Sequence, residues 1–306
     1  MKKICIFQIL TGLVFFAIVA FLGYSSHRIS MYIQNQMDET SNVKMEWLDI
    51  QKKRKYILRE ICSKYNMSAS TFEKTLSSQL FVEHRYKFIY CEVPKVGCTN
   101  WKRIMLQLTM NLTREPGDFE RETVHASSLL KKLSIYSLEK QQSLLQNYTK
   151  IMFTRNPEER LVSAYRDKFL HDGYYSNIIG SYIRHKYRKK DNDTSNVTFE
   201  EFIKFVLGEN TSDTHWKPMF MLCHPCSIHY DFIGEFSSLK KEADYILRYL
   251  GVPETVTYPN FKTHSNESRT FIKITEAFMS NITIKEKDEI HQKYEIDFLM
   301  FNYTFH

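Results

Sequence analysis

The stretch KFIYCEVPKVGCTNWKRIMLQ, residues 87–107, decides the fold of this chain. It begins with apolar and aromatic residues, turns at residues 94–100, and continues with the apolar spacing typical of a helix. This order predicts a strand, a tight loop and a helix. The first N–H groups of such a helix, and the positive end of its dipole, point at whatever lies above the loop. Because Lys95 stands inside the loop, we expect it to bind a phosphate or sulfate group; an ordinary turn with a surface lysine would look the same.

A second unit of the same kind follows. Residues 148–154 (YTKIMFT) predict a strand, and a charged turn then leads into a helix predicted for residues 157–170, with proline in the first turn, where its missing N–H costs nothing. Ligands bind at the carboxyl ends of parallel strands, so the two loops would offer two anion sites side by side. We expect the planar fork of Arg155 to hold one phosphate and the hydroxyl of Ser163 to reach the same group.

The rest of the chain alternates in the same manner. Residues 137–147 and 239–250 have helical patterns, Thr198 begins a capping box for a helix that ends near Gly208, and residues 230–236 predict a strand. Alternation of this kind predicts an α/β fold with a central, mainly parallel sheet flanked by helices.

The N-terminus predicts a membrane anchor. Residues 4–23 carry no charge and are about long enough to span a bilayer. A signal peptide has a shorter apolar core, so we favour an uncleaved signal anchor and leave open cleavage near Ala20 or Ser25. Lys2 and Lys3 place the short tail in the cytosol. The predicted segments are a cytosolic tail at 1–3, a transmembrane helix at 4–24, a luminal stem at 25–78 and a catalytic domain at 79–306.

Sequons and cysteines indicate the same compartment. Nine asparagines begin an Asn-x-Ser/Thr sequon: Asn66, Asn111, Asn147, Asn192, Asn196, Asn210, Asn266, Asn281 and Asn302. Outside the anchor the cysteines are Cys62, Cys91, Cys98, Cys223 and Cys226, and an oxidising lumen favours disulfides. Their number is odd, and we expect Cys98 to be the free one. For Cys223 and Cys226 we prefer disulfides to Cys62 or Cys91 or within the pair, over a zinc site or a redox motif.

Several charges have simpler explanations. Glu159, Arg160 and Arg166 would either take part in the site or form solvated pairs on one helix face, and the sequence favours neither. The net charge of +7 indicates acidic glycans or nucleotide donors as partners in a lumen, or only solubility. The basic run at residues 184–190 would attract an anionic glycan or form a solvated helix face.

Five segments resemble the Golgi carbohydrate sulfotransferases, in particular the group of chondroitin and dermatan 4-O-, GalNAc-4-O- and HNK-1 sulfotransferases. They are residues 94–102 (PKVGCTNWK), 155–169 (RNPEERLVSAYRDKF), 222–226 (LCHPC), 228–234 (IHYDFIG) and 297–303 (DFLMFNY). The similarity covers residues 81–306. Gly97 stands where Ala is more frequent in the family, and Asn156 where an acidic residue is more frequent.

The resemblance implies a P-loop-like sulfotransferase domain and the donor 3′-phosphoadenosine 5′-phosphosulfate. By its motifs, the 5′-phosphosulfate would be wrapped by Pro94, Lys95, Val96, Gly97, Cys98, Thr99 and Asn100. The 3′-phosphate would be held by Arg155, Asn156, Pro157, Glu158, Glu159, Arg160, Leu161, Val162 and Ser163. A cation at the bridging oxygen lowers the barrier to sulfuryl transfer, and Lys95 is the residue expected there. No metal is required.

The acceptor hydroxyl needs a base. His125 is the candidate because related sulfotransferases use a His or Glu beyond the first helix, and its ordinary pKa suits proton removal near neutral pH. A structural role is an equal alternative for His125. His224 and His229 are weaker candidates because they stand beside the paired cysteines.

The resemblance favours the 4-hydroxyl of GalNAc in chondroitin, dermatan or a glycoprotein glycan as acceptor, with glucuronic acid 3-O-sulfation of the HNK-1 type as an alternative. We therefore expect a single-pass type II protein of the Golgi membrane that binds a glycan and no nucleic acid; a homodimer is compatible with the sequence. A glycosyltransferase would need Asp191-Asn192-Asp193 as its metal motif, but no apolar strand precedes it. A glycan-binding protein without enzymatic activity is the third alternative.

Overall fold

The structure is a computed structural model that describes residues 28, 31, 45–67, 78–110, 117, 119–188, 195–208, 213–261 and 267–305. The chain divides into two compact units, Met1–Lys53 and Arg54–His306. In the first unit, residues 45–53 are helical and Lys52 pairs with Asp49 at 2.9 Å. The predicted anchor at 4–24 and the Asp191-Asn192-Asp193 motif lie outside the described residues. None of the helices in the described ranges is long and apolar enough to cross a membrane.

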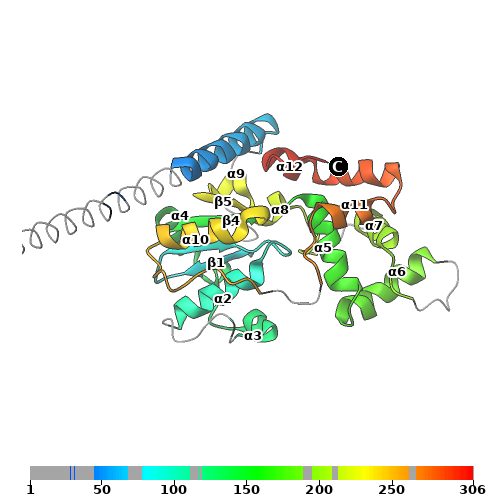
Figure 1. The fold of residues 1–306 in the computed structure, drawn as a ribbon, viewed down its shortest axis with the longest axis horizontal. Coiled ribbons are helices and arrows are strands. Elements are labelled where there is room, and N and C mark those ends of the chain that lie inside the picture. Colours follow the sequence, from blue (N-terminus) through cyan, green and yellow to red (C-terminus); the bar gives the residue numbers. More distant parts are fainter. Residues whose placement is uncertain are drawn as a thin grey trace, which may run out of the picture. The chain divides into compact units, whose positions relative to one another are not determined.

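The second unit is built on a five-stranded sheet with the order β3-β1-β2-β4-β5 (Figure 1). The strands are β1 (Leu80–Glu83), β2 (Phe88–Cys91), β3 (Lys131–Lys132), β4 (Thr149–Thr154) and β5 (Phe232–Glu235). Strands β2, β4 and β5 are parallel, as predicted, whereas β1 pairs antiparallel with both β2 and β3. The sheet is therefore mixed, and the expected mainly parallel sheet is wrong at this edge, because the turn at 84–87 folds β1 back on β2 as a hairpin.

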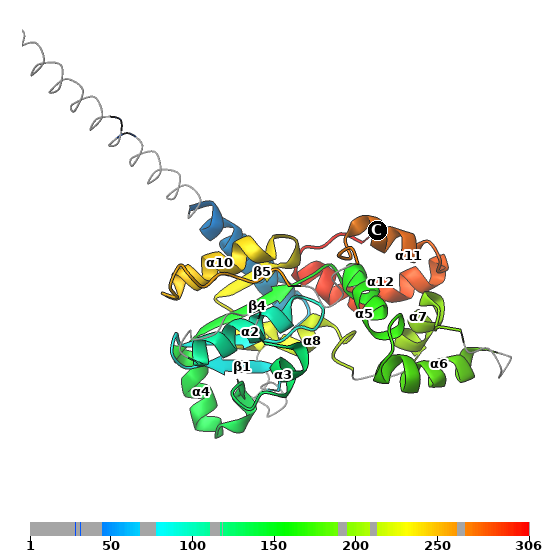
Figure 2. The same ribbon diagram turned by 60° about the horizontal axis from the view of Figure 1, so that its bottom comes forward.

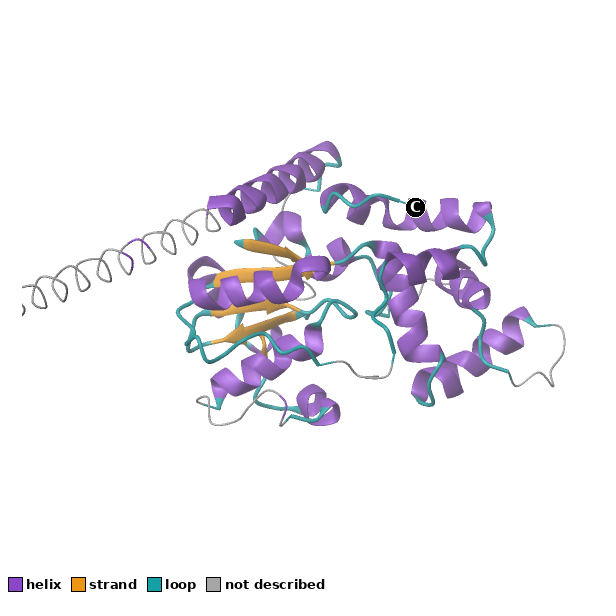
Figure 3. Cartoon of the chain, viewed as in Figure 1, coloured by secondary structure: helices purple, strands orange, loops and turns teal. Residues whose placement is uncertain are grey.

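Helices flank the sheet and form a separate, purely helical part beside it (Figure 3). They are α2 (Cys98–Thr109), α3 (Arg121–Ala126), α4 (Leu138–Asn147), α5 (Pro157–Phe169), α6 (Gly180–Tyr187), α7 (Phe199–Gly208), α8 (Met219–Cys223), α9 (Pro225–Ile228), α10 (Leu239–Tyr249), α11 (Ile272–Met279) and α12 (Ile284–Met300). Helix α10 packs against β5 and α2 against β1. Both views show α6 and α7 on the helical side, away from β1 (Figures 1 and 2).

Trp101 fixes the first helix against the sheet. Its ring, fully buried, stacks on Tyr90 of β2 at 5.3 Å and lies 5.5 Å from Phe153 of β4. Buried aromatic pairs of this kind add to the stabilisation from apolar burial. Since Trp101 stands in the first turn of α2, this packing holds the N-terminus of the helix at the carboxyl ends of β2 and β4.

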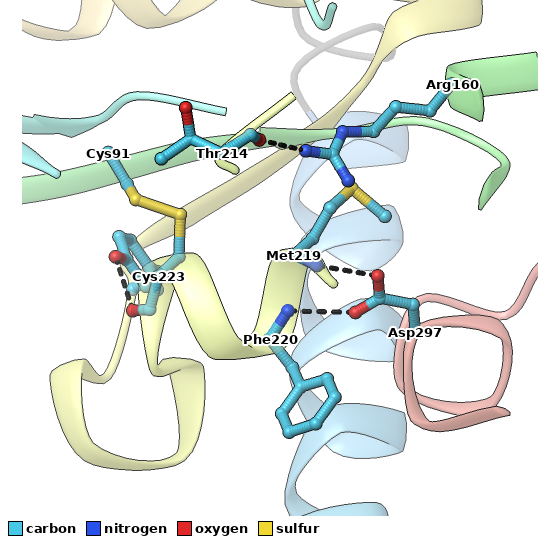
Figure 4. The surroundings of a disulfide bond; sticks show 8 residues. Cys91, Arg160, Thr214, Met219, Phe220, Cys223 and Asp297 are labelled. Atoms are coloured by element: carbon cyan, nitrogen blue, oxygen red, sulfur yellow. Dashed lines mark hydrogen bonds between the residues drawn. A yellow bond between two sulfur atoms is a disulfide. The ribbon is translucent and has the colours of Figure 1, made fainter. Parts of the chain in front are cut away.

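Two disulfides join distant segments. Cys62 pairs with Cys226, and Cys91 at the end of β2 pairs with Cys223 at the end of α8 (Figure 4). Cys98 is free and buried, as predicted, and of the pairings that the sequence left open the structure has Cys223 and Cys226 bonded to Cys91 and Cys62. Cys223 and Cys226 are therefore unavailable as zinc ligands, and they do not pair with each other. The second compact unit begins at Arg54, so it includes part of the segment predicted as stem. The Cys62–Cys226 bond lies within this unit.

Arg54 fastens the same segment. Its guanidinium contacts Glu242 of α10 at 2.7 Å, Glu235 of β5 at 2.9 Å and the carbonyl of Ile233 at 2.8 Å. The neighbouring carboxylates raise the pKa of Arg54 although burial opposes them. The helical segment at 54–64 is thus tied to β5 and α10 by the ion pairs of Arg54 and to α9 by the Cys62–Cys226 bond.

Candidate functional site

The two predicted anion-binding loops line one cavity of about 500 Å³. The first loop and the first turn of α2 contribute Pro94, Lys95, Gly97, Cys98, Thr99 and Asn100. The second unit contributes Arg155, directly after β4, and Ser163 from α5. The sequence therefore predicted correctly that these two loops lie together. The positive dipole end of α2 faces this space, which suits an anionic ligand.

The shape of the first loop depends on Gly97. Gly97 has φ +79° and is the N-cap of α2. A Cβ at this position would lie 2.4 Å from the hydroxyl of Tyr258 and 2.6 Å from Leu239. The Tyr258 hydroxyl donates to the Gly97 carbonyl at 2.9 Å. Position 97, where Ala is more frequent in the family, therefore requires glycine in this chain. Both the left-handed backbone and the close approach of Tyr258 exclude a side chain.

Lys95 occupies a strained and poorly hydrated position. Its φ is +72°, in the region that non-glycine residues rarely adopt. Its ammonium lies 3.1 Å from the carboxylate of Asp167, and the two side chains are 17% and 8% exposed. Burial lowers the pKa of Lys95 to about 8, although the Asp167 carboxylate opposes this shift. Lys95 is thus mainly charged at neutral pH. Burial of this charge is unfavourable, and an anionic ligand beside it would offset the lost hydration.

Arg155 ties the second loop to the first. Its guanidinium donates to the Lys95 carbonyl at 2.9 Å and to the Thr270 carbonyl, and pairs with Glu159 at 3.2 Å. It also lies over the ring of Phe236, 4.0 Å from the centroid. Burial lowers the pKa of Arg155 to about 10, so it remains charged at neutral pH. The expected fork is held rigidly at the cavity by these contacts.

Residues between Arg155 and Ser163 mostly build the helix rather than the cavity. Asn156 caps α5, because its side-chain oxygen accepts from the N–H of Glu158 at 2.9 Å and of Glu159 at 3.4 Å. Pro157 is in the first turn, and Leu161 and Val162 are buried in the helical core. Of the predicted set of nine residues, two therefore line the cavity and the other seven do not. Val96 is likewise buried.

Arg160 forms a clamp under the cavity, not a solvated helix-face pair. It is 2% exposed, and its guanidinium donates to the carbonyls of Pro94 at 3.0 Å, Lys217 at 2.7 Å and Thr214 at 2.7 Å. Figure 4 shows it reaching toward Thr214 near the start of α8. Arg166 is no solvated pair either, since it bonds the hydroxyl of Thr270 at 2.7 Å and Glu267 at 3.1 Å.

Asp297 of α12 binds the start of α8, close to Arg160. Its carboxylate accepts from the N–H groups of Met219 at 2.6 Å and Phe220 at 2.8 Å, and so caps α8 (Figure 4). Burial raises the pKa of Asp297 to about 6, although these two bonds and Arg160 oppose the shift. Asp297 stands in the segment 297–303 that resembles the family, and its role here is structural.

His125, the expected base, lies at the cavity but faces a cation. Its Nε2 is 3.2 Å from the Thr99 hydroxyl and its Nδ1 is 3.3 Å from the Lys102 ammonium. Lys102 pairs with Glu92 at 2.5 Å. Because an ammonium only donates, Nδ1 of His125 must accept, and the proton of the neutral ring is then on Nε2. His224 and His229 are not among the described residues that line the cavity.

Sequence reasoning missed several residues of the site. Asp167 could have been found, since Ser163, Arg166 and Asp167 lie at i, i+3 and i+4 on one face of α5. His215 with its partner Asp213, and the cavity-lining residues Tyr258, Phe261 and 267–270, come from segments without a motif, and only the folded chain brings His215 and these residues to the same cavity as Lys95. Among the described residues no group of three or more His, Cys, Asp or Glu side chains could hold a metal ion.

Comparison with known proteins defines the class. Residues 78–304 match the Sulfotransferase family, and the chain belongs to this family. It is 39% identical to carbohydrate sulfotransferase 9 of Homo sapiens, over 84% of this chain and 60% of that protein. It is 36% identical to carbohydrate sulfotransferase 11 of Rattus norvegicus, over 74% of this chain and 67% of that protein. It is 32% identical to carbohydrate sulfotransferase 14 of Danio rerio, over 91% of this chain and 78% of that protein.

The chain spans about 60% to 64% of the length of the first curated relatives that it matches. No solved structure matches it.

Proposed function

We propose that the chain is a carbohydrate sulfotransferase that moves a sulfuryl group from 3′-phosphoadenosine 5′-phosphosulfate to a sugar hydroxyl. The observation that carries the proposal is the meeting of Lys95 and Arg155, at the ends of two parallel strands, in one cavity at the N-terminus of α2. Two separated cations suit a donor with two separated anionic groups. Family membership and the names of the relatives support the same activity.

Within this reaction Lys95 would neutralise the bridging oxygen as it leaves the sulfur. The first turn of α2 would receive the 5′-phosphosulfate, and Arg155 with Ser163 the 3′-phosphate. The acceptor is proposed to be the 4-hydroxyl of GalNAc in chondroitin, dermatan or a glycoprotein glycan. Residues 4–24 would anchor the protein in the Golgi membrane with the catalytic unit in the lumen, and the two disulfides support an oxidising compartment.

An acceptor panel tests the proposal. The luminal part of the chain is incubated with the ³⁵S-labelled donor and with chondroitin, dermatan, GalNAc-terminated N-glycans and glucuronic-acid-terminated glycans, followed by disaccharide analysis. We expect label on the 4-hydroxyl of GalNAc. Label on the 3-hydroxyl of glucuronic acid would replace the acceptor, and Mn²⁺-dependent sugar transfer without sulfate transfer would overturn the proposal.

The pKa of Lys95 predicts how donor binding depends on pH. Below about pH 8 Lys95 is charged in the free protein and attracts the donor fully, whereas above it binding must first take up a proton. The affinity for adenosine 3′,5′-bisphosphate is therefore expected to fall between pH 7.5 and 9.5, by up to about tenfold per pH unit. Isothermal titration calorimetry in two buffers of different ionisation enthalpy measures both the affinity and the proton uptake.

The matched control is Lys95→Met, which should bind more weakly and take up less than half as many protons at pH 8.5. If the wild-type protein takes up no proton at that pH, Lys95 does not titrate on binding and the assigned contact with the donor is wrong.

A further inference from the structure

His215 and Asp213 form a hydrogen-bonded pair in the turn that precedes α8. The Nδ1 atom of His215 lies 2.8 Å from Oδ1 of Asp213, and the other carboxylate oxygen accepts from the Tyr175 hydroxyl at 2.7 Å. An ionised carboxylate only accepts, so Nδ1 of the neutral ring carries the proton and Nε2 carries the lone pair. The pair thus fixes the tautomer that can act as a base at Nε2.

His215 also lines the same cavity as Lys95, and its side chain is 22% exposed. Burial lowers the pKa of His215, against the hydrogen bond to Asp213, and the charges of Lys168 and Lys95 lower it further. Although burial opposes the shift, hydrogen bonds from His215 and Tyr175 keep the pKa of Asp213 below its usual value. At neutral pH the ring is therefore neutral and its orienting partner is ionised.

His125 has the opposite arrangement. The ammonium of Lys102 at 3.3 Å occupies the lone pair of Nδ1, and the proton on Nε2 points toward Thr99. A base must offer a lone pair to the hydroxyl that it deprotonates. Of the two histidines that line the cavity within the described part of the chain, His215 is the one whose hydrogen bonds leave a ring nitrogen, Nε2, with its lone pair.

We propose that His215, oriented by Asp213, is the general base that removes the proton from the acceptor hydroxyl; this rests on the proposed sulfuryl transfer. The O–H bond of the sugar breaks and its proton moves to Nε2 of His215. The sugar oxygen forms a bond to sulfur while the bond from sulfur to the bridging oxygen breaks, and that electron pair stays on the 5′-phosphate. The products are the sulfated sugar and adenosine 3′,5′-bisphosphate, and the imidazolium later loses its proton to solvent.

The test compares His215→Gln with His125→Gln in the full-length protein, with His84→Asn as a control outside the cavity. Turnover with the acceptor identified by the panel, binding of adenosine 3′,5′-bisphosphate and the thermal midpoint are measured for each variant. For His215→Gln we expect turnover to fall by about 10² to 10⁴-fold with bisphosphate affinity within about twofold of the wild-type value. Full turnover in His215→Gln, or a comparable loss only in His125→Gln, would overturn the proposal.

A purely structural role is separated by rescue and by the pH profile. Imidazole is expected to restore part of the turnover of His215→Ala. Asp213→Asn should lower turnover and move the acid limb of its pH profile to lower pH, because a carboxylate stabilises the imidazolium. The charged and titratable groups that act on the ring are Asp213, Tyr175, Lys168 and Lys95, and Asp167 pairs with both lysines. Lys95→Met is therefore profiled alongside, and an acid limb that only this variant moves would contradict the assignment.

These outcomes also separate the inference from the proposed function. If the wild-type protein transfers no sulfuryl group to any acceptor but binds the bisphosphate, the proposed function fails before His215 is in question. If the wild-type protein is active and His215→Gln does not fold, the Asp213→Asn profile decides, and an unshifted acid limb rejects His215 as the base.

Discussion

Lys95→Met is expected to lower the turnover number for sulfuryl transfer by about 10³-fold while the fold remains intact. The leaving bridging oxygen gains negative charge in the transition state. Lys95 is the cation of the first loop, and it lines the cavity together with the N-terminus of α2. The loss should appear mainly in kcat, because the charge develops only as the bond to sulfur breaks.

The fold should survive because methionine nearly matches the length of the lysine stem and removes a buried charge. Asp167 keeps a cation partner, since Lys168 lies 3.2 Å from the same carboxylate. The thermal midpoint and single-turnover kinetics with labelled donor are measured, with Lys240→Met as control. Lys240 is an exposed residue of α10 that pairs only within its helix, with Asp244 at 2.6 Å. A Lys95→Met protein that folds and turns over at more than a tenth of the wild-type rate would remove Lys95 from the chemical step.

The sequence predicted the elements of this fold that contiguous residues determine. The strand-loop-helix units at Lys95 and Arg155 were predicted with their order and approximate ends, because apolar periodicity, Pro157 and the loop residues are all contiguous. The hairpin of β1 with β2 was missed, since LFVE is only four residues long and the turn at 84–87 lacks a strong hairpin signal such as Asn-Gly.

The motifs predicted Lys95 as a cation of the site, but they did not predict the side chains that interact with it in the fold. Lys95 is identifiable from its loop, but Asp167, which lies 3.1 Å from it, stands 72 positions later in helix α5. His215, which lines the same cavity, and its partner Asp213 stand farther still along the chain from the two loops. Arg160 shows the same limit in reverse, because its position on a charged helix suggested solvent exposure while its guanidinium is fully enclosed. Long-range pairing of this kind is decided by topology, which a single sequence specifies only indirectly.

Arg160→Met is expected to lower the free energy of unfolding by about 3 to 5 kcal/mol, the range for removing one partner of a buried charged network. The side chain satisfies three carbonyls from two segments, Pro94 in the first loop and Thr214 and Lys217 before α8. After the substitution these carbonyls would lose this donor, and a buried carbonyl left without one costs about 1 to 3 kcal/mol before relaxation. Asp297 would also lose a nearby positive charge.

The comparison with Arg160→Lys separates charge from geometry. Lysine retains the positive charge but is a point donor without the planar fork, so it cannot reach all three carbonyls in the same way. We expect an intermediate unfolding midpoint in urea and weaker bisphosphate binding, since Pro94 begins the first loop. Arg59→Met is the control, because Arg59 is exposed on the helical segment at 54–64 and a surface substitution there should change stability by less than about 0.5 kcal/mol. If Arg160→Met unfolds at the wild-type midpoint, the clamp does not hold the loop, and the position of Lys95 must depend on Trp101 and Tyr258 alone.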